Sequence, residues 1–237
     1  MSTQRIDKLL GSLGYIESRK LAARLLRNHE VLHNGVRVTD TAAKVTHAGL
    51  TLDGKPLDPP QGMVILLNKP LGYVSSHADS GLRIYDLLPP RFMRRSPVVT
   101  SIGRLDKDAT GLLLLTDDGK LVQRLTSPRR HVPKTYAVEL ADALKGHEAE
   151  LFAAGTLMLR GEDKPLLPAV LEVTGEKTAL LTLHEGRYHQ VKRMFAAAGN
   201  RVEALHRTRM GALELGSLQP GEWRILDDNE KQQLLKD

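Results

Sequence analysis

The sequence is organised around the stretch GRLDKDATGLLLLTDDG, residues 103–119, in which a polar loop runs directly into four consecutive leucines. The leucines predict a buried strand, so the loop should hold Asp106 rigidly at the edge of the core. Catalytic groups usually lie on such loops, and Asp106 is therefore a candidate catalytic carboxylate. We expect Asp108, Asp117 and Asp118 to face water as turn residues. A glycosidase would need a paired second acid, and nothing in the sequence fixes one.

A second polar motif, EGRYHQVKRMF, occupies residues 185–195. The apolar spacing predicts a helix over residues 188–198, and Gly199 is typical of a helix end. Lys192 and Arg193 fall outside the apolar face, about one turn from the start of this helix. Such a basic pair is well placed to meet an anion, but it is equally typical of a solvated helix face.

Basic residues also gather in residues 124–134, where no acid accompanies Arg124, Arg129, Arg130 and Lys134. Clusters of this kind attract phosphate without sequence preference. Tyr136 and Tyr188 adjoin basic residues. Because aromatic residues make up only 4% of the chain, platforms for stacking several bases are scarce. Either tyrosine could hold one extruded base, although packing within a strand or helix is the more usual role of a tyrosine.

The segment from residue 61 to residue 237 contains more strands than helices. Apolar runs predict strands at 63–67, 112–115, 136–140, 170–173 and 179–183, and helices at 120–125, 148–154 and 188–198. These elements do not alternate regularly. An α+β domain with a mixed, mainly antiparallel sheet is therefore expected.

A smaller domain, residues 1–60, precedes this segment, and the sequence DPPQG at 58–62 marks the boundary. Apolar spacing predicts a helix over residues 6–13 and a second helix that begins after Ser18. Asn34-Gly35 and Asp53-Gly54 predict tight turns between short strands. The two helices could also form a DNA-binding helix-turn-helix, but the hairpins that follow and the lack of a dimerisation segment disfavour that alternative.

Composition narrows the class of protein. The 237 residues contain no cysteine, which excludes disulfides, thiol nucleophiles and cysteine-bound metals. The net charge of +6 favours a polyanionic partner. No stretch approaches the ~20 apolar residues of a membrane span, and the polar start lacks the apolar core of a signal peptide. We therefore expect a cytoplasmic protein without a membrane partner.

Taken together, these motifs resemble those of pseudouridine synthases. The stretch at 103–119 resembles the catalytic-aspartate motif in the form of the small-subunit ribosomal RNA branch, the RsuA family. Residues 67–73, 134–136 and 185–195 resemble three further motifs of these enzymes, in the family order. Residues 1 to about 60 resemble an S4 RNA-binding domain. The resemblance covers nearly the whole chain and implies an S4-like domain followed by a pseudouridine synthase domain.

The resemblance also implies roles for individual residues. Asp106 would be the catalytic carboxylate, Tyr136 would stack on the uracil, and Lys192 would be the cation beside Asp106, with Arg193 as the alternative. The implied RNA contacts, to which we add three positions in the S4-like domain, are Arg104, Arg129, Arg130, Arg187, Arg193, Arg19, Lys20 and Arg24. The reaction is an isomerisation, so no metal and no cofactor are expected.

The implied substrate is 16S ribosomal RNA, free or in an assembling small ribosomal subunit, and the implied target is the uridine numbered 516. An enzyme acting on 23S RNA remains the alternative within the family. A non-catalytic RNA-binding assembly factor is the alternative from another class, because everything except the Asp106 motif would fit it. No large exposed apolar stripe is evident, so we expect a monomer.

Overall fold

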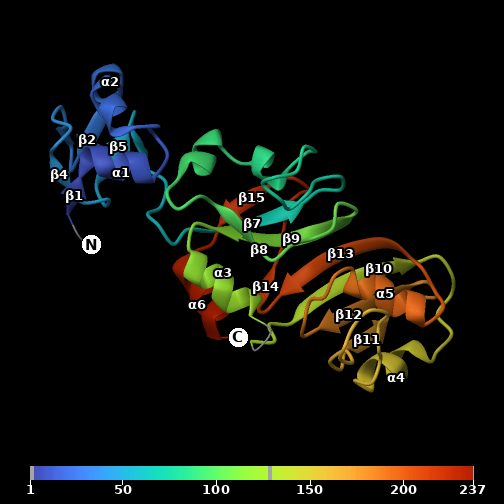
Figure 1. Cartoon of the computed structure of the whole chain (residues 1–237). Helices are drawn as coiled ribbons and strands as arrows, with labels where there is room; N and C mark the ends of the chain where they lie inside the picture. Colours follow the sequence, from blue (N-terminus) through green and yellow to red (C-terminus); the bar gives the residue numbers. More distant parts are fainter. Residues whose placement is uncertain (1–2, 128–129, 237) are drawn as a thin grey trace. The chain divides into compact units, whose positions relative to one another are not determined.

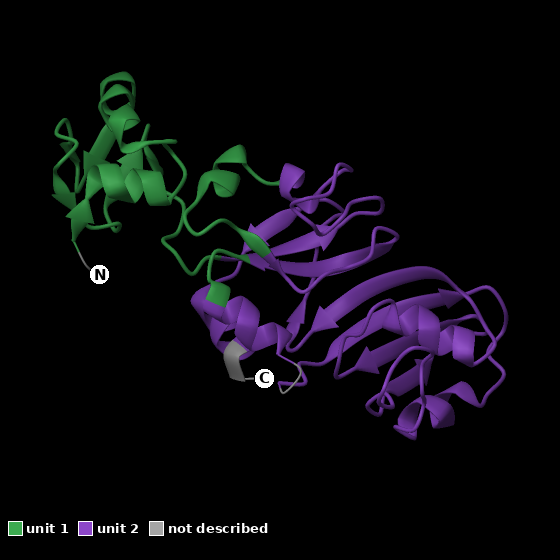
Figure 2. Ribbon diagram, viewed as in Figure 1, with its two compact units in different colours: residues 1–63, 88–100, 116–119 green, residues 64–87, 101–115, 120–237 purple. Residues whose placement is uncertain are grey.

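A computed structural model describes residues 3–127 and 130–236 of the chain (Figure 1). The chain forms two compact units, and neither is continuous in sequence (Figure 2). Unit 1 comprises residues 1–63, 88–100 and 116–119, and unit 2 comprises residues 64–87, 101–115 and 120–237.

Unit 1 contains two short helices and two small sheets. The strand order is β1-β4 in one sheet and β3-β2-β5-β6 in the other. Leu9 and Leu10 of the first helix and Leu26 of the second lie in one buried cluster with Val31 of the sheet. The elements are α1 (Ile6–Ser12), η1 (Arg19–Leu21), α2 (Ala22–Asn28), η3 (Pro90–Arg94), β1 (Gln4–Arg5), β2 (Val31–His33), β3 (Val36–Arg37), β4 (Lys44–Val45), β5 (Leu50–Leu52) and β6 (Lys55–Pro56).

Both predicted turns are present in unit 1. Asn34 and Gly35 join β2 to β3 with φ values of 52° and 79°, and Asp53 and Gly54 join β5 to β6 in the same left-handed region. Asn, Asp and Gly tolerate this region better than other residues, which is why the two turns could be predicted from the sequence. The second helix differs from the prediction: a 3₁₀ turn follows Ser18, whose side chain makes no capping hydrogen bond.

The prediction that Asp117 faces water is wrong. Asp117 is only 2% exposed and forms a buried ion pair with Arg95 at 2.7 Å. Its other carboxylate oxygen accepts a hydrogen bond from the backbone N–H of Gly62, and Arg95 also donates to the carbonyl of Pro59. One carboxylate therefore joins the three separate chain segments of unit 1.

Unit 2 is built on a nine-stranded sheet with the order β11-β12-β10-β13-β9-β7-β15, to which β8 and β14 add at β9 and β13. The pairing of β9 with β13 is parallel, whereas β10 pairs antiparallel with both β12 and β13. This is the mixed, mainly antiparallel sheet that the sequence predicts. The strands are β7 (Val64–Lys69), β8 (Thr100–Ile102), β9 (Ala109–Thr116), β10 (Lys134–Leu140), β11 (Val170–Val173), β12 (Thr178–Leu183), β13 (Val202–Met210), β14 (Leu213–Glu214) and β15 (Trp223–Ile225).

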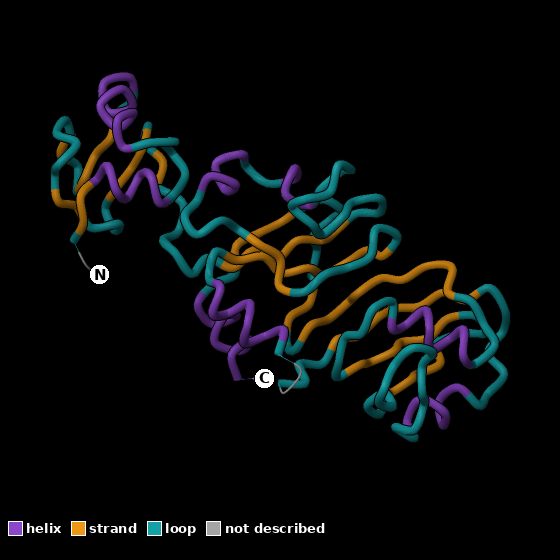
Figure 3. The backbone as a smooth tube through the Cα atoms, viewed as in Figure 1, coloured by secondary structure: helices purple, strands orange, loops and turns teal. Residues whose placement is uncertain are grey.

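Helices cover parts of this sheet (Figure 3). Leu125 of α3 (Gly119–Thr126) and Leu234 of α6 (Asp228–Lys236) share a buried cluster with Leu66 of β7 and Leu112 of β9. Elsewhere in the unit, the rings of Phe152 in α4 (Glu148–Ala153) and Phe195 in α5 (Gln190–Ala197) pack edge to face, with centroids 5.2 Å apart. A short 3₁₀ helix, η2 (Ile84–Leu87), completes the unit.

Two elements of unit 2 differ from the sequence predictions. The helix expected at 188–198 begins only at Gln190, because His189 adopts the left-handed conformation with φ 49° and ψ 34°. The nine-residue strand β13 was not predicted, although it lies between β9 and β10 in the sheet. No helix among residues 3–127 and 130–236 is both long and apolar enough to cross a membrane.

Candidate active site

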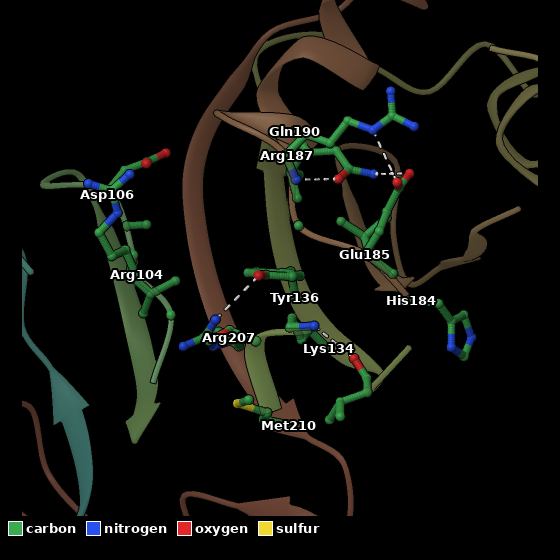
Figure 4. A pocket seen from close by; sticks show the side chains of 18 of the residues that line it. Arg104, Asp106, Lys134, Tyr136, His184, Glu185, Arg187, Gln190, Arg207 and Met210 are labelled. Carbon is green, nitrogen blue, oxygen red and sulfur yellow. Dashed lines mark hydrogen bonds and ion pairs between the residues drawn. The ribbon is translucent and has the colours of Figure 1, made fainter. Parts of the chain in front are cut away.

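A cavity of about 510 Å³ opens in unit 2 and contains the side chains that the sequence singles out (Figure 4). Its wall combines segments that are far apart in sequence: the loop 103–106, residues 125–127, the start of β10, parts of residues 183–192 and strand β13. The polar side chains that line it include those of Asp106, Tyr136, Lys192, Lys134, Arg207 and His189.

Asp106 lies in the loop before β9, and its side chain is 30% exposed. The Nζ atom of Lys192 lies 3.5 Å from one carboxylate oxygen, and Nε2 of His189 lies 3.5 Å from the other. Lys192 is in the first turns of α5, and His189 owes its position to the left-handed backbone just before that helix. Of the two candidates for the cation beside Asp106, Lys192 and Arg193, it is Lys192 that lies next to the carboxylate.

Lys192 is shared between two carboxylates. Its Nζ atom donates a 2.5 Å hydrogen bond to Asp108, which lowers the pKa of that carboxyl below its usual range. The Asp108 side chain is mostly exposed, as predicted, whereas Lys192 is only about a quarter exposed. The carboxylates of Asp106 and Asp108 therefore both contact the Nζ atom of Lys192, which lines the cavity.

A buried lysine fixes the loop that carries Asp106. Lys69, at the end of β7, is fully buried, and its Nζ atom donates to the carbonyl oxygens of Ala109 at 2.6 Å and Lys107 at 3.4 Å. Burial lowers the pKa of Lys69 to about 8, although Asp108 and Asp106 oppose the shift. These carbonyls lie on either side of Asp108, so Lys69 ties the end of the Asp106 loop to the core.

Tyr136 lies on β10 with 9% of its surface exposed, and it lines the cavity. Its ring lies 5.9 Å from the guanidinium carbon of Arg207, and its hydroxyl accepts a 3.5 Å hydrogen bond from Arg207 (Figure 4). The tyrosine is therefore packed among its neighbours and also lines the cavity.

Arg187 and Arg193, two of the predicted RNA contacts, are held by the protein itself. Arg187 pairs with Glu185 and Glu162 and donates to the carbonyls of Lys164 and Pro165. Arg193 pairs with Glu162 and donates to two further carbonyls. Their guanidinium groups hold the segment 160–165, and no contact places Arg193 beside Asp106.

The other predicted RNA contacts have varied surroundings. Arg104 is exposed beside Asp106 and lines the cavity, and Arg130 is exposed at a small hollow beside α3. Arg129 lies outside the described residues. In unit 1, Arg19 forms an ion pair with the buried Asp7, whereas Lys20 and Arg24 are exposed on the same surface turn and helix.

The sequence predicted no catalytic role for Lys69, His189 or Arg207. Lys69 sits at the end of an apolar run, where a lysine normally turns to solvent. The conformation of His189 carries no sequence signal, because glycine is the usual residue at positive φ. Arg207 lies in the unpredicted strand β13. Across residues 3–127 and 130–236, no group of three or more His, Asp and Glu side chains could hold a metal ion.

The chain is similar to known proteins over almost its whole length. Residues 63–197 match the family model for RNA pseudouridylate synthase, and residues 4–58 match that for the S4 domain. Ribosomal small subunit pseudouridine synthase A of Vibrio vulnificus is 44% identical, and that of Escherichia coli is 43% identical, each match covering 95% of this chain and 97% of the relative. A solved structure described as a pseudouridylate synthase is 38% identical with a TM-score of 0.69, and the match covers 98% of this chain and 99% of that one. The chain therefore belongs to the RNA pseudouridylate synthase family and is an isomerase that carries an S4 domain.

Proposed function

We propose that this protein converts one uridine of 16S ribosomal RNA to pseudouridine, the uridine numbered 516, with Asp106 as the catalytic carboxylate. The observation that carries the proposal is the gathering of Asp106, Tyr136 and Lys192 from three separate segments around one cavity. The RNA class is that named for the relatives that are 43–44% identical over almost their entire length.

The geometry suits the steps that this isomerisation needs. The bond between the base and C1′ of the ribose must break, the base must turn without escaping, and C5 must then bond to C1′. The Asp106 carboxylate can act as a nucleophile or stabilise charge at the sugar, and the Nζ atom of Lys192 lies 3.5 Å from it. The ring of Tyr136 can stack on the detached uracil and keep it in the cavity.

The target uridine must leave its stack to reach Asp106. Extruding a base costs a few kcal/mol, and the cost is least in loops and bulges. In this proposal, exposed cations on unit 2 help to offset the cost by holding neighbouring phosphates. Arg104, beside Asp106, and Arg130 are the described candidates.

We further propose that residues 1–60 bind RNA at a site of their own and that residues 61–237 carry out the chemistry. Linking two weak sites raises the effective concentration of the second contact. Of the three phosphate contacts predicted in this domain, Lys20 and Arg24 are exposed, whereas Arg19 already pairs with Asp7.

Replacing Lys20 and Arg24 together with glutamine should weaken RNA binding and flatten its salt dependence. Each lost phosphate contact should reduce the slope of log K against log[salt] by about 0.7 to 0.9, depending on whether the bound RNA is single- or double-stranded. Filter binding of 16S RNA over a series of salt concentrations measures the slope. Lys55→Gln, an exposed lysine of the same unit, is the matched control. An unchanged slope for the double variant would remove both residues from the interface.

The proposed function is tested by mapping pseudouridines with carbodiimide and primer extension. Unmodified 16S RNA, free and in small-subunit particles, is incubated with the protein, and 23S RNA is treated in parallel. One new stop in 16S RNA at uridine 516 is expected. A stop elsewhere in 16S RNA would correct the position, and a stop only in 23S RNA would overturn the choice of RNA. Tight binding without any stop would indicate a non-catalytic assembly factor.

A further inference from the structure

Arg207 is a buried cation without a carboxylate partner. It is 2% exposed, and no carboxylate oxygen of the described side chains lies within 4.0 Å of its guanidinium group. Its Nε atom donates to the carbonyl of Leu112 at 2.6 Å, its Nη1 atom donates to the Tyr136 hydroxyl, and its Nη2 atom is buried without any hydrogen-bond partner in the described chain. Burying an unpaired charge is costly, so its presence beside a cavity calls for a function.

The backbone fixes Arg207 at the centre of the catalytic strands. It is paired with Gly111 of β9 on one side and with Tyr136 of β10 on the other. A Cβ atom at Gly111 would lie 2.3 Å from the Arg207 carbonyl oxygen, so the two strands approach more closely than a side chain there would allow. Strand β9 begins just after the Asp106 loop, and Arg207 therefore links the strand that positions Asp106 to the strand that carries Tyr136.

A second cation lies in the same part of the cavity. Lys134, two residues before Tyr136 on β10, lines the cavity, and its Nζ atom donates only to the carbonyl of Val132. Burial, together with the charge of Arg207, lowers the pKa of Lys134 to about 8. The carboxylate of Glu185, which also lines the cavity, already forms an ion pair with Arg187. Figure 4 shows Tyr136, Lys134 and Arg207 grouped on their strands, with Asp106 on the neighbouring segment.

We propose that Arg207, together with Lys134, stabilises the negative charge that develops on the uracil as its bond to the sugar breaks. The proposal rests on the proposed function. It identifies an anionic pyrimidine base as the ligand of the part of the cavity that Arg207, Lys134 and Tyr136 form. Arg207 acts through Tyr136 as a positioning residue: because it donates to the hydroxyl oxygen, the hydroxyl hydrogen is left to donate to a base carbonyl.

The chemistry balances without a co-reactant. When the C1′–N1 bond breaks, its electron pair stays on the base and is shared by N1, O2 and O4. The Asp106 carboxylate meets the electron-poor C1′ and leaves again when C5 of the turned base bonds to that carbon. The proton on C5 then departs and N1 takes up a proton. A positive wall stabilises the charged intermediate stage more than either neutral end state, which is the condition for catalysis.

The test compares leaving groups. Fluorine at C5 withdraws electrons, so a 5-fluorouracil anion needs less help from the wall. RNA carrying uridine or 5-fluorouridine at the mapped target position is reacted under single-turnover conditions, and consumption of the N1-linked nucleoside is followed by chromatography of nuclease digests. Arg207→Met should slow uridine consumption by about 10²-fold, in the range for losing one stabilising donor, and 5-fluorouridine consumption about tenfold less. Arg207→Lys should recover part of the loss.

Arg209→Met is the matched control, because Arg209 lies on the same strand, is 55% exposed and pairs with Glu214. It should change neither rate. If Arg207→Met fails to fold, Lys134→Met carries the same comparison, since Lys134 is only partly buried. Equal losses with both RNAs would overturn the proposal, because a merely structural residue cannot distinguish the two bases. If the wild-type protein consumes neither base, the proposed function fails first, and this proposal fails with it.

Discussion

Asp106→Asn is expected to lower the rate of pseudouridine formation by on the order of 10⁴-fold or more, which is the loss of rate found when other enzymes lose a nucleophile. The amide keeps the shape of the side chain but carries no charge, so it can neither attack the sugar nor stabilise positive charge there. Single-turnover rates with the mapped RNA measure the effect. RNA affinity should stay close to that of the wild-type protein, because the phosphate contacts are untouched.

The matched control for this prediction is Asp163→Asn, an exposed aspartate of the same unit that does not line the cavity. It should retain wild-type rates. The prediction is specific because the rate should fall while the RNA affinity stays the same. A variant that lost RNA binding but kept its rate at saturating RNA would show that Asp106 positions substrate, and would contradict its role as the reacting carboxylate.

Several features of the fold could be predicted because their causes are local in sequence. Asp106 lies in a loop directly before four leucines, and all four are fully buried, as the apolar run indicated. The turns at Asn34-Gly35 and Asp53-Gly54 follow from backbone conformations that few residues tolerate. Gly199 likewise ends α5 at positive φ. In each case the cause lies within a few neighbouring residues, so a single sequence contains it.

The rest depends on contacts between segments that are distant in sequence. Strand β13 reads Val-Glu-Ala-Leu-His-Arg-Thr-Arg-Met, and its buried face carries Arg207 where an apolar residue would have signalled a strand. Its place in the sheet comes from pairing with β9 and β10, about 65 to 95 residues earlier. The prediction that Asp117 faces water failed for the same reason. A DDG sequence is typical of an exposed turn, and only the tertiary structure brings Arg95 next to Asp117.

Asp117→Ala is expected to cost about 3–5 kcal/mol in the free energy of unfolding, the range for removing one partner of a buried ion pair. The substitution leaves the Arg95 guanidinium charged and buried, with its Nη1 atom already unpartnered. It also removes the acceptor of the Gly62 N–H. Urea unfolding monitored by circular dichroism measures the loss. Asp86→Ala, which breaks the exposed Arg83–Asp86 pair at 2.8 Å, is the control and should cost no more than about 1 kcal/mol.

The double variant Arg95→Met, Asp117→Leu separates the two sources of this loss. With both charges gone, the desolvation cost disappears, and an apolar pair of similar size is often as stable as a buried ion pair. The Gly62 N–H still lacks an acceptor, which should leave a deficit of about 1–3 kcal/mol. The double variant should therefore be more stable than Asp117→Ala alone and less stable than wild type. A double variant as unstable as the sum of two single losses would mean that Arg95 and Asp117 act independently, contrary to their 2.7 Å contact.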